Sequence, residues 1–584
     1  MTGLCAAYGD SASVRDTKQL AEVMDYRALG GYDCISFSDC TLCHLHYNST
    51  DKPHIDSQPF VEDSAAITLD GSIDNRSEVQ DILRQHSTTT YANLTDAEFL
   101  LSAYRELGAD SFNHIYGSYV GVIYDRTTNK TIIFRGLSGG RHLYYAKEVR
   151  GNTTLIASEV EALLQHQAVN STVHKQSVSN YISGSISRQP ISFHSSIERL
   201  RQGEYVVISG NETSHHRVVA NDDPVDDSGG YCASQLRTQI TQAISDRAKS
   251  KKSAGVMLSG GLDSSAIAAE MARQKGSQSV KGYSLIFPDE ESIDETSNIR
   301  SLTQSSNIEC IDLRKSVKQL FDEYNPFRYT FGHPCIDMSL PIFEAIFDRA
   351  SADNIDILQT GIGGNLHDGN RLFYSDLSSL GEYQKIAQIS NEDSVSALTI
   401  ILYALLPSIF STTRAITEID KLNSSPPSLH ENVLPTHMER FSRLETLRTY
   451  INLTNPYMDY ALDACRQVAL SHGIELQHPF LDGRILKALF QTHPADRFKN
   501  GYWKATFRDA VRNLLPQEIV RTPVSENTYN RISEQFSKLY IQEMDTERQA
   551  GRNTSSQEEV WRRICATEWV REVSVNGEID TPLS

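Results

Sequence analysis

One short stretch combines residues that can bind a polyphosphate: Ser259-Gly260-Gly261-Leu262-Asp263-Ser264-Ser265. It follows an apolar run with strand character and precedes a run of small residues typical of a closely packed helix, 266–272. At such a strand–turn–helix junction the backbone amides point to one place, where the helix dipole favours an anion. Gly260 and Gly261 let the backbone approach a phosphate without a Cβ collision, and Asp263 can hold a magnesium ion against it.

This stretch favours a phosphate-binding loop over a plain helix cap. A cap needs one hydroxyl, whereas this junction carries two glycines, an aspartate and three serines. A P-loop NTPase is not supported, because the stretch has no lysine where a Walker A loop needs one. We therefore predict that the following residues bind a nucleotide: Leu258, Ser259, Gly260, Gly261, Leu262, Asp263, Ser264 and Ser265.

Length, charge and cysteine content limit the kind of protein. At 584 residues the chain should form more than one domain. Its 74 acidic residues against 55 basic ones give a net charge of −19, which argues against binding to nucleic acid or to an anionic membrane surface. The sequence shows no membrane span or signal peptide, so we expect a cytoplasmic protein. Its nine scattered cysteines are then expected to be reduced thiols rather than a disulfide framework.

The first part of the chain is rich in strands. Residues 119–124 and 131–134 are predicted to form a hairpin, and residues 96–107 have the apolar spacing of a helix. A polar, turn-rich segment at 221–230 is the clearest linker. We expect one α+β domain over residues 1–220 and a second domain over residues 231–584.

The second part alternates strands and helices, as a doubly wound parallel sheet requires. Strands are expected over 280–287, 308–313 and 355–360, with a helix over 295–304 between the first two. The last strand runs into a glycine-rich turn, which is where such sheets bind ligands, so Thr360 and Gly361 join the predicted nucleotide site. From about residue 373 the chain is predicted to be mostly helical.

The segment Cys40-Thr41-Leu42-Cys43-His44-Leu45-His46 offers two interpretations. Its cysteines and histidines match the spacing of a compact zinc site. In a strand, however, Cys43 and Leu45 point to one side while His44 and His46 point to the other. We favour a plain strand.

Several motifs together resemble a known family. The loop around Asp263 looks like the pyrophosphate-binding loop of ATP pyrophosphatases. Four segments of the first part, in the family's order, resemble glutamine amidotransferase domains of asparagine synthetases: 69–75, 95–98, 135–145 and 157–163. The blocks 478–482 and 504–510 resemble the synthetase half of the same family. The chain is thus similar to asparagine synthetases over nearly its whole length.

This resemblance implies both a fold and an activity. The fold would be an α+β sandwich domain of the N-terminal-nucleophile type. A doubly wound α/β parallel-sheet domain, adenine nucleotide α-hydrolase-like, would follow it and end in a helical part. The activity would be ATP- and Mg²⁺-dependent: a carboxylate becomes an acyl-adenylate, pyrophosphate leaves, and an amine captures the acyl group.

The resemblance also implies roles for partners and residues. The acid would be a small-molecule or peptide carboxylate, the nitrogen donor an amine, ammonia or glutamine, and a homodimer is one assembly open to the chain. The residues implied are Asp263, Lys504 and Arg508 for catalysis and Leu285 and Ile286 beside the adenine.

The glutaminase chemistry of the first part departs from the family's pattern. Family members use an N-terminal cysteine whose α-amino group is the general base, whereas the candidates here are Cys5 and Thr2. The family's oxyanion-hole asparagine is replaced by Asp70, next to Gly71, and its substrate-gripping glutamate is replaced by Ser72. Of the glutamine-binding set Asp96 remains. A poor glutaminase is expected.

The synthetase half departs as well. Relatives carry a second magnesium-holding aspartate where this chain has Gly364, and a catalytic lysine where it has Val524. Asp368 is a candidate for the metal. The phosphates have three candidate cations: Lys504, Arg508 and Arg521.

Three hypotheses follow. The first is an amide-forming ligase that makes asparagine with glutamine or ammonia. The second is an intramolecular amide ligase without glutaminase activity, similar to β-lactam synthetases and lasso-peptide cyclases. The third is a catalytically silent protein that binds a nucleotide.

Overall fold

The computed structural model of the chain describes residues 2–28, 30–47, 58–86, 91, 93–149, 151–218, 232–248, 253–276, 279–288, 295–324, 331–369, 371–393, 400–401, 403–404, 443–522, 538 and 557–576. The predicted linker at 221–230 and Val524 lie outside the described residues.

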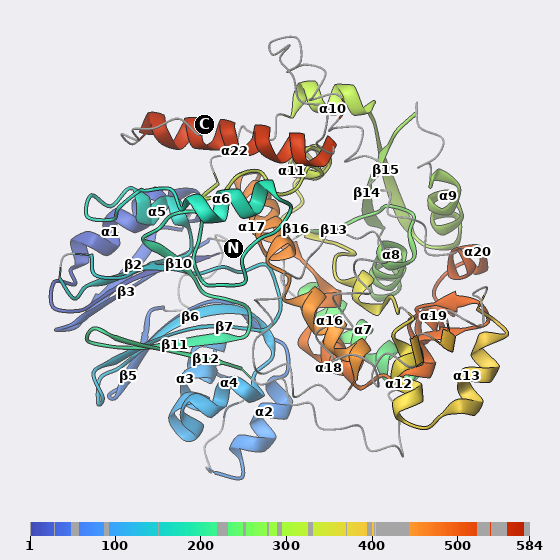
Figure 1. Cartoon of the computed structure of the whole chain (residues 1–584), viewed down its shortest axis with the longest axis horizontal. Coiled ribbons are helices and arrows are strands. Elements are labelled where there is room, and N and C mark those ends of the chain that lie inside the picture. Colours follow the sequence, from blue (N-terminus) through green and yellow to red (C-terminus); the bar gives the residue numbers. More distant parts are fainter. Residues whose placement is uncertain are drawn as a thin grey trace.

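The first part of the chain forms two six-stranded sheets (Figure 1). The first has the order β10 (Ile197–Arg199), β8 (Tyr144–Ala146), β9 (Thr154–Ala157), β1 (Gly3–Tyr8), β3 (Cys40–Leu45) and β2 (Tyr32–Ser36). The second has the order β12 (Glu212–Arg217), β11 (Glu204–Ser209), β7 (Lys130–Arg135), β6 (Gly117–Asp125), β5 (Ala65–Ile73) and β4 (Phe60–Val61). All neighbours are antiparallel, and the predicted hairpin is confirmed as β6 and β7.

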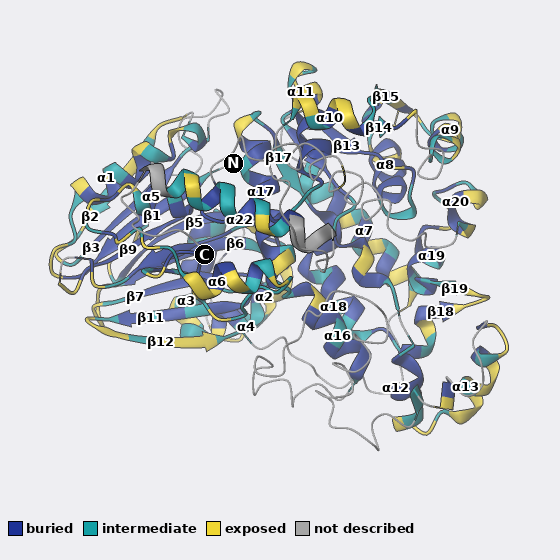
Figure 2. Ribbon diagram, turned by 45° about the horizontal axis from the view of Figure 1, so that its top comes forward, coloured by how far each residue is buried: buried dark blue, intermediate teal, exposed yellow. Residues whose placement is uncertain are grey.

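The two sheets pack face to face around an apolar core that draws residues from both, among them Leu4 and Ile156 of the first and Val122 and Val206 of the second. Helices α1 (Val14–Val23) and α5 (Val160–Leu164) cover the outer face of the first sheet. Helices α2 (Arg76–Leu83), α3 (Asp96–Leu107) and α4 (Ser111–His114) cover the second. The predicted sandwich is therefore confirmed. Figure 2 shows its strands as mainly buried, whereas the edge strand β12 carries exposed residues.

The predicted helix over 96–107 is confirmed as α3. Its start is fixed by a capping box, in which the Thr95 hydroxyl accepts from the Glu98 amide and the Glu98 carboxylate accepts from the Thr95 amide. Local sequence therefore defines this helix.

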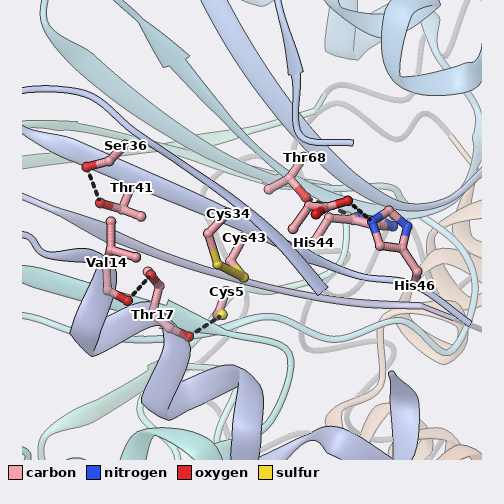
Figure 3. The surroundings of a disulfide bond; sticks show 11 residues. Cys5, Val14, Thr17, Cys34, Ser36, Thr41, Cys43, His44, His46 and Thr68 are labelled. Carbon is pink, nitrogen blue, oxygen red and sulfur yellow. Dashed lines mark hydrogen bonds and ion pairs between the residues drawn. A yellow bond between two sulfur atoms is a disulfide. The ribbon is translucent and has the colours of Figure 1, made fainter. Parts of the chain in front are cut away.

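The expectation that all cysteines are reduced is wrong for Cys34 and Cys43, which form a disulfide (Figure 3). The two residues lie directly opposite each other on β2 and β3, and that position brings their Cβ atoms close. The other seven cysteines are free.

The preference for a strand over a zinc site is confirmed, since residues 40–45 form β3. His44 lies with Nδ1 3.1 Å from the Thr68 hydroxyl. Among the described residues there is no group of three or more side chains arranged to hold a metal ion.

The second part contains a parallel sheet of five strands. Its order is β15 (Ile308–Arg314), β14 (Val280–Ile286), β13 (Ala254–Met257), β16 (Ile357–Gln359) and β17 (Glu475–Gln477). One face is covered by α7 (Ala233–Ala248), α8 (Leu262–Lys275), α9 (Thr296–Ser305), α19 (Ala505–Val511) and α20 (Gln517–Arg521). The other is covered by α10 (Val317–Glu323), α11 (Leu340–Ala352), α17 (Pro456–Ser471) and α22 (Gln557–Asn576). The predicted doubly wound sheet is confirmed, and its order reverses between β13 and β16.

The remaining described elements are α6 (Lys175–Ile182), α12 (Phe373–Ser379), α13 (Tyr383–Ser390), α16 (Leu444–Leu453), α18 (Gly483–Gln491) and the short hairpin β18 (Phe498–Lys499) and β19 (Tyr502–Trp503). None of the helices in the described ranges is both long and apolar enough to cross a membrane.

Helix α17 joins the two parts through buried charges. Its Asp459 carboxylate accepts hydrogen bonds from Arg199 at 2.6 Å and from Arg135 at 3.2 Å, and lies 2.8 Å from His142 Nε2. One turn later Asp463 accepts from the Tyr144 hydroxyl at 2.6 Å. The two aspartates and their four partners all belong to the interior, because none of these six side chains is more than 4% exposed. A buried ionic cluster therefore joins the two parts at α17.

We predict that Asp459→Asn destabilises the protein by about 3–5 kcal/mol, because Arg135 and Arg199 then remain buried without their counter-charge. Burial alone raises the pKa of Asp459, but Arg135 and Arg199 outweigh it and hold that pKa well below its usual range. The stabilisation is therefore present at neutral pH and is lost as the pH falls below about 3.9, the ordinary pKa of aspartate. Urea unfolding at pH 7 and at pH 3 measures both effects.

Asp81→Asn is the matched control, since the Asp81 side chain is 71% exposed and pairs with Arg84 at the surface. It should change the unfolding free energy by less than about 0.5 kcal/mol. Equal losses for the two variants would contradict the role assigned to Asp459.

Candidate functional site

The reversal of strand order places two loops side by side. The loop of Ser259, Gly260 and Gly261 leads from β13 into α8, and the loop that starts at Gly361 follows the neighbouring strand β16. The loops touch, because a Cβ atom added to Gly361 would lie 3.1 Å from the Ser264 amide nitrogen. Ligands of doubly wound sheets bind at this point, outside the carboxyl ends of the strands.

The first loop has the geometry of an anion site. Gly260 is left-handed, with φ +86°, and a Cβ there would lie 2.8 Å from Glu295 Cβ. Gly261 caps α8 without a side chain, so the first amides of a 14-residue helix have no capping group. The hydroxyls of Ser259 and Ser264 lie 3.0 Å apart, and Ser264 also accepts from the Ser259 amide at 3.1 Å. These serines shape the loop by accepting from the amides of Ser259 and Gly261, and they leave the first amides of α8 for a ligand.

The two loops and a distant helix bring three charged side chains together. Lys504 Nζ lies 2.8 Å from Asp263 Oδ2 and 3.2 Å from Asp368 Oδ1. The Lys504 side chain is 5% exposed. Burial lowers the pKa of Lys504, but Asp263 and Asp368 outweigh it and raise that pKa, so the ammonium stays charged. Burial raises the pKa of Asp368 to about 6, although Lys504 opposes the shift.

Lys504 is held in an unusual backbone conformation. Its φ of 61° and ψ of 32° are left-handed, and the residue is the N-cap of α19. Such a conformation costs about 1–3 kcal/mol in a residue other than glycine, and it clusters at functional sites. The predicted residues Asp263, Lys504 and Asp368 thus meet at one point. The backbone at Lys504 is strained in the conformation that brings its side chain there.

This point suits a magnesium ion. Two carboxylates from separate loops converge on one cation, and in the structure the Lys504 ammonium stands in for that cation. Carboxylate oxygens are the ligands that Mg²⁺ takes from proteins. Asp263 and Asp368 therefore fit the metal.

The position of the Asp263 carboxylate requires a glycine at 364. A Cβ atom on Gly364 would lie 2.3 Å from Asp263 Cγ, closer than two carbon atoms can approach. A side chain at 364 and the observed position of Asp263 exclude each other. Asp368, four residues further on, supplies the second carboxylate from outside that contact.

The other two predicted cations, Arg508 and Arg521, have positions different from that of Lys504. Arg508 donates through Nε to the Trp503 carbonyl at 2.7 Å and through Nη1 to the Val520 carbonyl. It therefore supports the turn that carries Lys504. Arg521 is exposed at the end of α20.

The other predicted nucleotide residues lie at the carboxyl ends of their strands. Leu285 and Ile286 end β14, the neighbour of β13. The Thr360 hydroxyl lies 2.7 Å from His478 Nδ1 and accepts from the Ile362 amide at 3.3 Å, so it holds the second loop in shape.

The sequence analysis missed Glu295 as a site residue. Glu295 packs against Gly260, because a Cβ atom there would lie 2.8 Å from Glu295 Cβ and 2.9 Å from the Glu295 carbonyl oxygen. Burial raises the pKa of the Glu295 carboxyl to about 7. Its match to the family's Asp-Glu pair, directly after the adenine-side strand, was the available signal.

The remnant of the glutamine pocket is filled by ion pairs. Asp70 is fully buried, and it accepts from the Thr2 hydroxyl at 2.5 Å, from Arg466 at 2.9 Å and from Arg141. Burial opposes ionisation, but Arg141 and Arg466 outweigh it and lower the pKa of Asp70. This carboxylate is negative and already paired, so it cannot donate to an oxyanion.

Gly71 and Asp96 also have structural roles. Gly71 has φ +138°, and a Cβ there would lie 2.1 Å from the Ser118 carbonyl oxygen of the adjacent strand. Asp96 accepts from Arg76 at 2.6 Å and from the Ile73 amide at 3.1 Å.

Cys5 lies in the interior of the first sheet. Its thiol donates to the Thr17 carbonyl of α1 at 3.2 Å, as Figure 3 shows, and its side chain is fully buried. Burial raises the pKa of this thiol, which keeps it protonated. A buried, protonated thiol is a poor nucleophile.

Comparison with known proteins matches the chain to two family models. The model described as asparagine synthase covers residues 235–572, and the model described as glutamine amidotransferase domain covers residues 1–219. Asparagine synthetase [glutamine-hydrolyzing] 1 of Bacillus subtilis (strain 168) is 19% identical over 84% of this chain and 80% of its own. Asparagine synthetase [glutamine-hydrolyzing] 3 of the same organism is 21% identical over 78% and 74%. The amidase chyE of Penicillium rubens is 22% identical over 61% and 55%.

We predict that Gly364→Ala weakens Mg-ATP binding by about tenfold or more. The added methyl group must displace the Asp263 carboxylate from Lys504, and overpacking of this kind costs about 1–3 kcal/mol. Calorimetric titration of the full chain with Mg-ATP measures the loss.

Gly140→Ala is the control, because the nearest atom to a Cβ at Gly140 is 3.5 Å away. It should bind Mg-ATP as the parent does. A Gly364→Ala variant of unchanged affinity would show that Asp263 does not contact the bound metal or nucleotide.

Proposed function

The chain belongs to the asparagine synthase family, and from this premise we propose that it is an ATP-dependent amide-forming ligase. It activates a carboxylate as the acyl-adenylate, releases pyrophosphate, and joins the acyl group to an amine with release of AMP. The observation that carries this proposal is the meeting of Asp263, Asp368 and Lys504 beside the glycine loop.

In this proposal, separate sets of residues bind the polyphosphate, the adenine and the metal of Mg-ATP. The turn at Gly260 and the first amides of α8 receive the polyphosphate, because no side chain caps the start of this helix. We propose that Leu285 and Ile286, the last residues of β14, contact the adenine. Asp263 and Asp368 hold Mg²⁺, which supplies positive charge that screens the phosphates and eases the departure of pyrophosphate.

Lys504 supplies a second positive charge, which would lie beside the metal once Mg²⁺ takes the position between the two carboxylates. Its ammonium is buried and stays protonated, so its interaction with charge that develops on the departing pyrophosphate is not weakened by water. The turn that aims it is braced by Arg508. We propose that Lys504 takes over the task of the lysine that relatives carry where this chain has Val524.

The nitrogen source we propose is an amine or free ammonia rather than glutamine. The relatives from Bacillus subtilis carry the words glutamine-hydrolyzing in their names. In this chain the Cys5 thiol is buried and protonated, and Asp70 is paired with two arginines. The proposal also covers an acid that carries its own amine, as in the intramolecular ligases similar to β-lactam synthetases and lasso-peptide cyclases.

The test counts pyrophosphate, AMP and amide separately after incubation of the full chain with Mg-ATP and candidate acids, aspartate first. We expect equal amounts of pyrophosphate and AMP that depend on the acid. Asp263→Asn should lower both to the background by removing a metal ligand, whereas Asp312→Asn on β15, 39% exposed, should leave them unchanged.

Two outcomes decide between the hypotheses. Pyrophosphate without any amide, for every acid and amine tried, would place the defect in the capture step. Tight binding of Mg-ATP without pyrophosphate from any acid would overturn the proposal in favour of a silent nucleotide-binding protein.

We predict that glutamine yields no glutamate above the background when the full chain is incubated with it. The physical reason is that neither candidate nucleophile is free: Cys5 is buried, and the Thr2 hydroxyl already donates to Asp70. A coupled glutamate assay measures the release. Glutamate that disappears in Cys5→Ala or in Thr2→Ala would prove this prediction wrong and restore the glutaminase.

A further inference from the structure

The Lys504 ammonium lies where the carboxylates of Asp263 and Asp368 converge. Its Nζ atom is 2.8 Å from Asp263 Oδ2 and 3.2 Å from Asp368 Oδ1. Among the described residues, neither aspartate forms an ion pair with any other cation. Two carboxylates therefore share one positive charge, and the oxygens that suit a magnesium ion are the same oxygens that the ammonium contacts.

The two carboxylates can be reached from solvent, whereas the lysine lies behind them. The Asp263 side chain is 23% exposed and the Asp368 side chain is 32% exposed, against 5% for Lys504. A metal ion can therefore approach both aspartates from outside. It cannot take their oxygens while the ammonium holds them, because the two cations repel each other at such short range.

The backbone that carries Lys504 is fixed by its neighbours. A Cβ atom on Gly369, the residue after Asp368, would lie 2.8 Å from two ring carbons of Trp503, so the segments before Lys504 and after Asp368 are in direct contact. Arg508 donates to the Trp503 carbonyl at 2.7 Å. Movement of the ammonium is thus confined to the flexible four-carbon stem of the lysine side chain.

We propose that Lys504 and Mg²⁺ compete for the carboxylates of Asp263 and Asp368, so that this place accepts the metal together with the nucleotide rather than before it. Asp263 is the second residue of α8, and its carboxylate therefore lies beside the helix start that would receive the polyphosphate. Rotation of the lysine side chain transfers its ammonium from the carboxylates to the phosphates. The inference rests on the proposed function, because it takes Mg-ATP as the ligand of this site.

The test is a calorimetric titration of the full chain, first with magnesium chloride alone and then with Mg-ATP. Lys504→Met should bind Mg²⁺ alone at least about tenfold more tightly than the parent, because the carboxylates lose their competing cation. The same variant should bind Mg-ATP at least about tenfold more weakly, because the phosphates lose a buried positive charge. Damage to the structure of the site would weaken both, so opposite signs exclude a merely structural role.

Two further variants serve as controls. Lys499→Met removes the same charge from the hairpin that carries Trp503, where the Lys499 side chain is 59% exposed and pairs with Asp509. It should bind both ligands within about twofold of the parent. Asp368→Asn combined with Lys504→Met should lose the tighter binding of Mg²⁺, since a metal ligand is removed.

The outcomes separate this inference from the proposed function. Equal binding of Mg²⁺ alone by the parent and by Lys504→Met, lost in both on Asp368→Asn, overturns the competition and leaves the metal site in place. Binding of Mg²⁺ that depends on Asp368 in no variant overturns the metal site and this inference with it. If Lys504→Met does not fold, Lys504→Gln decides by the same titrations, because its amide still donates to the carboxylates and carries no charge.

Discussion

The buried contact between α17 and the first part of the chain is the constraint on which the rest of the structure depends. Asp459 and Asp463 lie one helical turn apart and face Arg135, Arg199 and His142. A charge removed from water is tolerated only next to its partner, so these pairs form in one relative arrangement of the two parts. The same helix carries Arg466 to Asp70, so a further ion pair crosses the interface.

The candidate reaction site depends on topology in a different way. Asp263 follows β13 and Asp368 follows β16, and these strands are neighbours only because the sheet reverses its order there. Lys504 reaches them from the start of α19, where its left-handed backbone directs the side chain inward. Each of the three elements is held by its own packing, which pre-organises the charges before any ligand arrives.

The first part of the chain folds as a sandwich of two sheets, and its buried polar residues make structural contacts. Asp70, in place of the family's asparagine, neutralises arginines from both parts, and Cys5 packs under α1 with its thiol bonded to Thr17. In this chain the sandwich supplies Arg135, His142 and Arg199 to hold α17. The sandwich thus has a physical task of its own, the positioning of the second part of the chain.

The sequence by itself determined the features that rest on local pattern. The glycine loop at 259–261, the hairpin of β6 and β7, the capping box of α3 and the alternating strands and helices could all be predicted, because each depends on residues close in the chain. Tertiary structure alone decided which distant residues meet: Lys504 and Asp263 are 241 positions apart, and Cys34 and Cys43 pair across two strands. A side chain at Gly364 would collide with Asp263, and the second carboxylate at this point comes from Asp368. Such contacts are set by burial and by the register of packed elements, and no local propensity encodes them.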